Sequence, residues 1–300
     1  MKLGIIYAGQ GSQVVGMGKS FYPHEIFDQN EDLKELCFNG PLEKLSYTPY
    51  TQPCMVMVAI IITDLLKEHG IVPDYTAGLS LGEYSALYCA GVFKRQQVID
   101  LARFRGKVMQ EAVSEIESEM IAVLGMKEEL LQDLCHQASS LGVVSISNYN
   151  CPGQLVVAGE KKAVEKVKEL ALENKARRVI ALNTSGPFHT SLLKEASLAL
   201  KERFKKETFH EMKIPVIFNT LGHEIEYQSI PEILEKQVMS PVYFEKSIRY
   251  MIDQGVDTII EAGPGKVLSG FVRKIDRSIQ LYQIEDMESL KKTVKALKGE

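Results

Sequence analysis

The sequence predicts an α/β protein in which helices cover a parallel sheet and a smaller unit is inserted into the chain. Short apolar runs alternate with helical patterns in the first and last thirds of the 300 residues, an order typical of parallel sheets. Between them the order changes to strand, helix, strand, strand, helix, strand, which is the ferredoxin-like βαββαβ plan. We therefore expect a large unit from residues 1–117 and 186–300, an inserted unit from residues 118–185, and a cleft between the two.

The elements of the large unit follow from its apolar periodicity. We expect a strand over Leu3–Ala8, a helix over Gln52–His69, a strand before Gly78, helices after Ser80 and over Val98–Ala112 and Ser191–Phe204, strands over Pro215–Asn219 and Thr258–Glu261, and a last strand and charged helix within residues 280–300. Gly70 and Pro73 end the first long helix, because neither residue continues a helix well.

The inserted unit is predicted in the same way. Its expected elements are a strand over Met120–Leu124, a helix over Lys127–Ser139, strands over Val143–Tyr149 and Gln154–Ala158, a helix over Lys161–Glu173 and a strand over Arg178–Leu182. The turn at residues 150–153 contains Pro152 and Gly153, which suit the tight connection of a hairpin.

Composition excludes several classes of function. The net charge of −4 provides no basic field for nucleic acid. The longest apolar run, Cys54–Ile62, is shorter than the ~20 residues that cross a bilayer, so we expect no membrane partner. The five cysteines have no metal-like spacing, which favours reduced thiols in the cytoplasm. The same spacing leads us to expect no metal. We also expect no cofactor, because Gly9–Gln13 and Gly263–Lys266 fail the dinucleotide and phosphate-loop patterns.

A GxSxG pentapeptide, residues 78–82, lies where a strand pattern gives way to a helical one. In such a nucleophile elbow, a tight turn exposes the serine hydroxyl beside the positive end of a helix. The pattern alone is short enough to occur by chance, but its strand-to-helix context makes Ser80 a candidate nucleophile.

Arg105 lies near the middle of an apolar stripe when residues 98–112 are placed on a helix. A guanidinium keeps its proton, and a buried charge without a partner costs several kcal/mol. Arg105 therefore needs an anion. The anion is either an internal carboxylate or a group on a bound ligand, and the helix pattern leaves both readings open.

A serine nucleophile needs a base within hydrogen-bond reach. Of the six histidines, five lie at a helix end, on an amphipathic helix, in a charged stretch or in turns. His189 differs, because it lies where the chain leaves the inserted unit and so at the edge of the predicted cleft. The turn after the first strand, residues 9–13, can direct backbone N–H groups at a developing oxyanion.

Together these motifs resemble the malonyl-CoA:acyl carrier protein transacylases over nearly the whole chain. The resemblance rests on Gly9–Gln13, Tyr50–Pro53, Gly78–Leu87, Arg105–Gln110, Asn148–Gly153, Pro187–His189 and Glu261–Gly270. It implies an α/β-hydrolase-like core with an inserted ferredoxin-like subdomain. It also implies a monomeric cytoplasmic acyltransferase that moves malonyl groups from malonyl-CoA to acyl carrier protein, by a ping-pong route, for fatty-acid biosynthesis.

The resemblance also assigns roles to single residues. Ser80 corresponds to the acylated nucleophile and His189 to its base, in a dyad completed by the backbone carbonyl of Gln237. The oxyanion hole corresponds to the backbone N–H groups of Gln10 and Leu81. Arg105 would hold the malonyl carboxylate, and Phe188 matches the form associated with malonyl rather than methylmalonyl donors.

Two positions depart from the family pattern, since Leu79 replaces the usual His and Ala8 the usual Pro. Three alternatives stay open: a discrete malonyl acyltransferase of a polyketide pathway, a serine thioesterase or hydrolase, and a non-catalytic protein on the same fold. A hydrolase usually needs an acid after the serine, for which Asp100 and Asp133 are the candidates. Carrier docking needs a local basic patch, for which the candidates are Arg273, Lys274 and Arg277.

Overall fold

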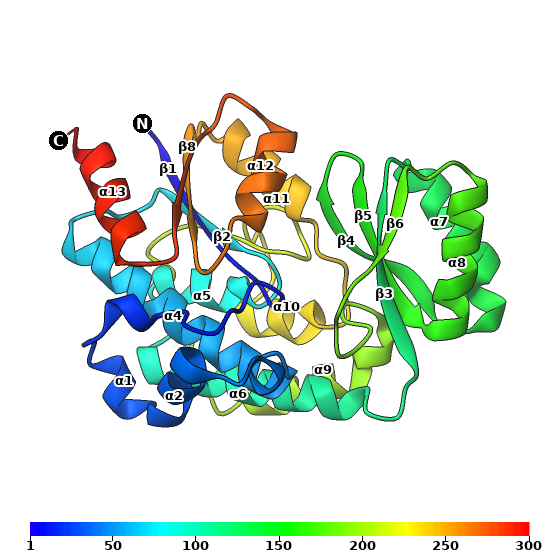
Figure 1. Ribbon diagram of the computed structural model, residues 1–300, viewed down its shortest axis with the longest axis horizontal. Helices are drawn as coiled ribbons and strands as arrows, with labels where there is room; N and C mark the ends of the chain where they lie inside the picture. Colours follow the sequence, from blue (N-terminus) through cyan, green and yellow to red (C-terminus); the bar gives the residue numbers. More distant parts are fainter. Residues whose placement is uncertain (300) are drawn as a thin grey trace.

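Two sheets of different type organise the structure (Figure 1). The structure is a computed structural model and describes residues 1–299. One sheet has five strands in the order β7-β2-β1-β8-β9, and the other has four in the order β4-β5-β3-β6. The predicted α/β class, with a parallel sheet and a separate strand-and-helix unit, is confirmed.

Every neighbouring pair in the five-stranded sheet is parallel. Its strands are β1 (Leu3–Tyr7), β2 (Tyr75–Gly78), β7 (Val216–Ile217), β8 (Thr258–Ala262) and β9 (Gln280–Ile284). The register places Tyr7 beside Gly78 on one side and Ala262 on the other. Because parallel strands end at the same edge, the loops that follow β1, β2, β7 and β8 meet there, where open α/β sheets place their sites.

Helices cover both faces of this sheet, as parallel sheets require. Along β1, Ile5 and Tyr7 pack into the core formed with α4 (Thr48–Glu68), α5 (Gly82–Cys89) and α6 (Arg95–Ala112). Ile6 points to the opposite face, toward α11 (Phe244–Asp253) and α12 (Val267–Ile275). The remaining helices of this part are α1 (Ile26–Gln29), α2 (Glu31–Asn39), α3 (Leu42–Leu45), α9 (Lys194–Phe204), α10 (Ile230–Gln237) and α13 (Met287–Lys298).

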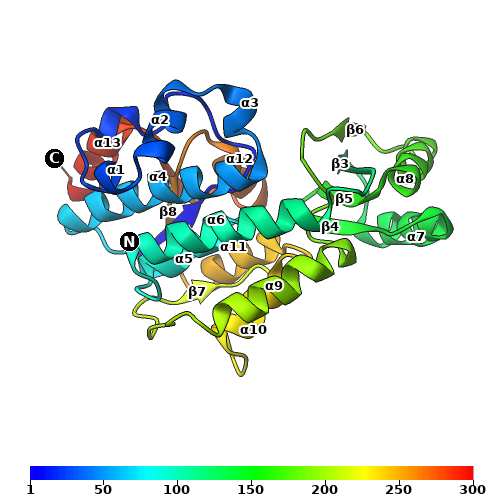
Figure 2. The ribbon, with the colours of Figure 1, turned by 90° about the horizontal axis from the view of Figure 1, so that it is seen from below.

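Helix α4 is the most apolar long helix. Its 21 residues and mean hydropathy of 1.4 are sufficient, by length and composition alone, to cross a membrane. However, 83% of its apolar window is buried inside the protein, as expected for a helix that crosses the core. Figure 2 shows α6 running alongside α4 and leading into the antiparallel sheet.

The four-stranded sheet is antiparallel throughout. Its elements are β3 (Ser118–Leu124), α7 (Glu128–Ala138), β4 (Val144–Cys151), β5 (Gln154–Glu160), α8 (Lys161–Glu173) and β6 (Arg178–Ala181). Helices α7 and α8 cover the face that carries Ile121, Val123 and Val157, on the side away from the parallel sheet (Figure 1). The opposite face carries Met120 and Val156, which pack with the core of the large sheet.

The predicted elements are present, with shifted ends. The helix predicted from residue 52 begins at Thr48 instead. The strand predicted over residues 215–219 is reduced to Val216–Ile217, because the chain turns at Phe218, whose N–H donates to the carbonyl oxygen of His223 and not to a strand. The helix predicted from residue 191 opens with a 3-10 turn, Ser191–Leu193, before α9 begins.

Candidate active site

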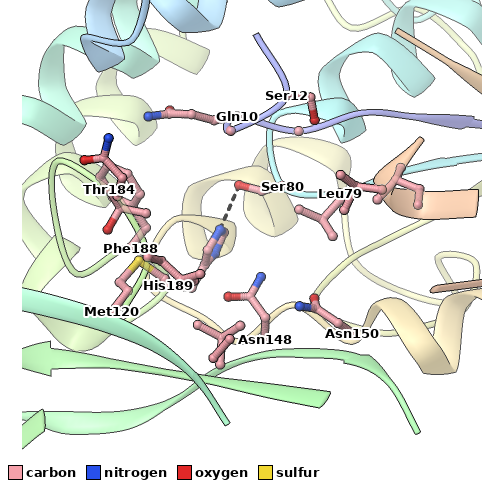
Figure 3. Close-up of a pocket in the computed structure, with 18 of the residues that line it drawn as sticks. Gln10, Ser12, Leu79, Ser80, Met120, Asn148, Asn150, Thr184, Phe188 and His189 are labelled. Carbon is pink, nitrogen blue, oxygen red and sulfur yellow. Dashed lines mark hydrogen bonds between the residues drawn. The ribbon is translucent and has the colours of Figure 1, made fainter. Parts of the chain in front are cut away.

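A cavity of about 410 Å³ lies between the two sheets. Its walls come from the loops at the carboxyl edge of the parallel sheet, from α12, and from the face of the antiparallel sheet that α7 and α8 leave uncovered. Figure 3 shows Ser80 and His189 pointing toward one another in this cavity. The predicted cleft is therefore present and holds both residues.

The turn that presents Ser80 joins β2 directly to α5. Ser80 has a φ of 53°, in the left-handed region that residues with a Cβ rarely adopt. A Cβ on Gly78 would lie 2.0 Å from the carbonyl carbon of Gly82, and one on Gly82 would lie 2.2 Å from the carbonyl oxygen of Tyr7. Only glycine fits at either position, which explains both glycines of the pentapeptide.

His189 lies in hydrogen-bond reach of the serine. Its Nε2 is 2.7 Å from Ser80 Oγ, and its Nδ1 is 2.9 Å from the carbonyl oxygen of Gln237 and 3.1 Å from that of Ser240. Since carbonyl oxygens only accept hydrogen bonds, Nδ1 carries the proton and Nε2 is free to accept one from the hydroxyl. Burial, together with the charge of Arg105, lowers the pKa of His189 to about 4, so the ring is neutral at pH 7.

The candidate hydrolase acids lie elsewhere. Asp100 is on α6, where it accepts a hydrogen bond from Gln96, and Asp133 is exposed on α7. Within residues 1–299, the imidazole Nδ1 of His189 contacts backbone carbonyls and no carboxylate. The arrangement is therefore a serine–histidine pair oriented by main-chain oxygens.

Arg105 lines the cavity and is buried, with 1% of its surface exposed. Its Nη1 donates to Gln52 Oε1 at 2.9 Å, and its Nη2 donates to Gln237 Oε1 at 2.9 Å and to Ser80 Oγ at 3.1 Å. The guanidinium carbon lies 5.4 Å from the centre of the Tyr84 ring, a cation–π distance. All of these partners are neutral.

No carboxylate forms an ion pair with Arg105 in the part of the chain that the structure describes. The internal-carboxylate reading of the sequence is therefore wrong for direct contact. Glu83 is the acid that influences Arg105 electrostatically. It is fully buried, its Oε2 accepts from the backbone N–H of Asn219 at 2.5 Å, and burial raises its pKa to about 7.

Two backbone N–H groups flank the serine. Gln10 follows β1 and lines the cavity, and its side chain is turned to Thr48, with Nε2 donating to Oγ1 at 2.9 Å. Leu81 is the first residue after Ser80 and precedes the first residue of α5. Neither backbone N–H forms a hydrogen bond within residues 1–299, so both are free to bind an oxygen atom in the cavity.

The remaining predicted residue, Phe188, is 7% exposed and also lines the cavity. Leu79, which departs from the family pattern, lines it as well, and Figure 3 shows both side chains at its wall. The wall beside the serine is therefore more apolar than it would be with His at residue 79.

Sequence reasoning missed three residues that contact Ser80 or Arg105, namely Gln52, Tyr84 and Asn219. It also missed Glu83, which binds the backbone of Asn219 and acts on Arg105 through its charge alone. A signal existed for Asn219, because it ends the strand predicted at residues 215–219 and parallel strands end at one edge. Gln52 and Tyr84 look like ordinary helix residues in the sequence, and only the packing of α4, α5 and α6 brings them to Arg105.

No group of three or more His, Cys, Asp and Glu side chains in residues 1–299 is arranged to hold a metal ion. The five cysteines are buried free thiols.

Comparison with known proteins supports one family. The acyl transferase domain family matches residues 5–295. Malonyl CoA-acyl carrier protein transacylase of Bacillus subtilis is 41% identical over 311 aligned residues, which cover 100% of this chain and 98% of the relative. The crystal structure of the Clostridium perfringens malonyl CoA-acyl carrier protein transacylase matches with a TM-score of 0.95 and 41% identity, covering 100% and 98% of the two chains. A malonyl-transacylase in complex with a type II PKS acyl-carrier protein matches with a TM-score of 0.94 and 34% identity over 100% of both chains.

Proposed function

The chain belongs to the malonyl-CoA:acyl carrier protein transacylase family and is an acyltransferase, and from this we propose that it forms a malonyl-serine intermediate on Ser80. The malonyl group comes from malonyl-CoA and passes to the phosphopantetheine thiol of an acyl carrier protein. The single observation that carries the proposal is the buried guanidinium of Arg105, which hydrogen-bonds the Ser80 hydroxyl and has only neutral partners within residues 1–299.

In the first half-reaction, His189 Nε2 accepts the proton of Ser80 Oγ while Oγ attacks the thioester carbon of malonyl-CoA. The thioester oxygen becomes negative and binds the backbone N–H groups of Gln10 and Leu81. The tetrahedral intermediate then expels CoA, whose sulfur takes the proton from His189. The backbone carbonyl of Gln237 stabilises the imidazolium that His189 forms while it holds the proton.

In the second half-reaction, the carrier thiol gives its proton to His189 and attacks the malonyl-serine ester. Ser80 leaves and recovers its proton, so one site serves both halves of a ping-pong cycle.

Arg105 selects the donor. Its two Nη atoms can bind the free malonyl carboxylate as a fork, after releasing the amide oxygens of Gln52 and Gln237. A donor without that carboxylate, such as acetyl-CoA, leaves the buried charge without an anion. Phe188 takes up space beside the reacting carbon and disfavours a methyl branch, as in methylmalonyl-CoA.

The finer description of the fold belongs to the same proposal. We assign residues 1–117 and 186–300 to an α/β-hydrolase-like unit and residues 118–185 to an inserted ferredoxin-like unit, in a cytoplasmic monomer. Fatty-acid biosynthesis is the proposed pathway. Supply of malonyl groups to a polyketide carrier is the second candidate, favoured by the likeness to a transacylase bound to such a carrier.

We assign carrier docking to the exposed basic residues Arg273, Lys274 and Arg277 at the end of α12. Helix α12 also lines the cavity, through Phe271 among others. Lys274 Nζ donates to Gln154 Oε1 at 3.1 Å, and Gln154 lines the cavity too. The basic cluster is therefore next to residues that line the cavity, which suits the binding of an acidic carrier with its thiol arm inside.

Intact-mass spectrometry after mixing with equal acetyl-, malonyl- and methylmalonyl-CoA tests the proposal. We expect one malonyl adduct that is lost on adding carrier protein, and none in Ser80→Ala. Ser12→Ala is the matched control, because Ser12 lines the same cavity and should leave the adduct intact. Replacing Arg273 and Arg277 by Glu should slow only the carrier step. A malonyl adduct that persists in Ser80→Ala would assign the nucleophile to another residue.

A further inference from the structure

We infer that Asn219 is a positioning residue, which holds the turn at Ser80 in its reactive conformation through hydrogen bonds to the backbone on both sides of Leu79. The inference rests on the proposed role of Ser80 as nucleophile. Asn219 follows β7 and is 2% exposed. It is remote in sequence from the pentapeptide, which it reaches because β7 pairs with β2.

The side-chain amide of Asn219 spans the turn. Its Nδ2 donates to the carbonyl oxygen of Gly78 at 2.6 Å, and its Oδ1 accepts from the backbone N–H of Ser80 at 2.6 Å. One side chain thus binds the last residue of the strand and the residue that carries the hydroxyl. A carboxylate or a hydrocarbon of the same shape cannot make both bonds, because one requires a donor and the other an acceptor.

Asn219 is itself held by its main chain. Its backbone N–H donates to Glu83 Oε2 at 2.5 Å, and its carbonyl oxygen accepts from the N–H of Tyr243 at 2.8 Å. Glu83 is on α5, one turn after Ser80. The amide is therefore aimed from a backbone that is fixed at both ends, as positioning of a catalytic group requires.

The turn needs such a constraint. The φ of 53° at Ser80 is unfavourable for a residue with a side chain and persists only where surrounding groups enforce it. Gln237 holds the other side of the same residue, since its Nε2 donates to the carbonyl oxygen of Ser80 at 2.9 Å. Asn219 also occupies the N–H of Ser80, so that the oxyanion hole is left to the N–H groups of Leu81 and Gln10.

The test measures the alignment of Ser80 without malonyl-CoA or carrier. A small alkyl fluorophosphonate reacts with an aligned serine: Oγ forms a bond to phosphorus, fluoride leaves, and the serine proton passes to His189. Asn219→Leu keeps the branched shape and removes both hydrogen bonds, while Asn219→Asp keeps the acceptor for Ser80 and removes the donor to Gly78. Asn30→Ala is the matched control, because Asn30 is also 2% exposed and its amide makes comparable bonds, to Ile26 and Gln96.

We expect phosphonylation to slow about 100-fold in Asn219→Leu, the loss typical of a misplaced reacting group, and about tenfold in Asn219→Asp. The KM for malonyl-CoA should stay within a factor of about three in both, because Asn219 makes no contact with the proposed carboxylate site. Asn30→Ala should react at the wild-type rate even where its thermal stability falls.

A wild-type phosphonylation rate in folded Asn219→Leu would overturn the inference. If that variant does not fold, the same rate in Asn219→Asp would overturn it. The outcome is independent of the malonyl proposal, because an enzyme that failed to transfer malonyl groups would still report the alignment of Ser80 through the fluorophosphonate.

Discussion

Two of the three arginines on helix α6, Arg95 and Arg105, have contrasting surroundings. Near its start, Arg95 pairs with two carboxylates: its Nε is 2.8 Å from Asp64 Oδ2, and its Nη1 contacts Glu25. Ten residues further on, Arg105 has amide, hydroxyl and aromatic partners and no carboxylate in ion-pair distance within residues 1–299. The partly exposed arginine has its counter-charge, and the fully buried one has none among the residues that the structure describes.

This difference supports the proposal that Arg105 is a charge kept for a ligand, whereas Arg95 is a structural charge. Taking a guanidinium out of water costs several kcal/mol, which internal carboxylates usually offset. At Arg105 the neutral oxygens of Gln52 and Gln237 orient the group without cancelling its charge. On the proposed function, the cost of burying this charge is offset by an incoming anion. Arg95 on the same helix shows that the fold does supply carboxylates to an arginine that has only a structural role.

The largest expected effect is that of replacing Arg105 on the choice between malonyl-CoA and acetyl-CoA as donor. Arg105→Ala should lower the rate of malonyl transfer by ~100-fold or more, because it removes the group that recognises the carboxylate. Transfer from acetyl-CoA should stay the same or rise, since no buried charge is left unpaired. The measurement is kcat/KM with each donor separately.

Arg103→Ala is the matched control, because Arg103 lies on the same helix and pairs at the surface with Asp32. Arg103→Ala should leave kcat/KM unchanged with both malonyl-CoA and acetyl-CoA. An equal loss with malonyl-CoA and acetyl-CoA in Arg105→Ala would mean that Arg105 supports the site in general and does not select the donor.

The three residues that meet in the candidate site could be picked out of the sequence because each carries a local signal. Ser80 stands in a short motif between a strand and a helix, Arg105 breaks an apolar stripe, and His189 follows the boundary of the inserted unit. Each signal lies within one segment, so periodicity and motif spacing reveal it.

The side-chain contacts that hold this set could not be predicted in the same way, although the family resemblance named Gln237 for its backbone carbonyl. Gln52 on α4 and Gln237 at the end of α10 contact one guanidinium from elements far apart in the sequence. Their contacts depend on how the helices pack across the sheet, which no single segment encodes.

Glu83 sharpens the contrast, because it is a carboxyl near Arg105 whose ionisation is disfavoured by burial. Its pKa is raised from 4.5 to about 7, so between these values the unfolded chain has lost a proton that the folded chain retains. This group's contribution to stability is therefore full below pH 4.5 and is lost as the pH rises to about 7, by ~3 kcal/mol in all. Glu83→Gln should remove that part of the pH dependence.

Urea unfolding of wild type and Glu83→Gln from pH 4.5 to pH 8 measures the difference. His189 contributes the opposite slope, because its pKa is lowered, but it is present in both proteins and cancels in the comparison. Parallel stability curves for the two proteins would show that Glu83 is ionised in the folded state and neutralises Arg105 from within.

The smallest effect should come from Arg95, the arginine with its own carboxylates. Its side chain is 42% exposed, so solvent screens the pair, and Arg95→Ala should lower the free energy of unfolding by about 1 kcal/mol. Some of that loss arises because Asp64, which is only 8% exposed, is left without its cationic partner. The loss is limited because Asp64 keeps its hydrogen bond from Tyr88 at 2.6 Å. The ratio of malonyl to acetyl transfer should not change, because Arg95 lies about three helical turns from Arg105. A change in that ratio, measured beside the urea curve of the same preparation, would show that the two arginines are coupled along α6 and that the division between structural and ligand-directed charge is wrong.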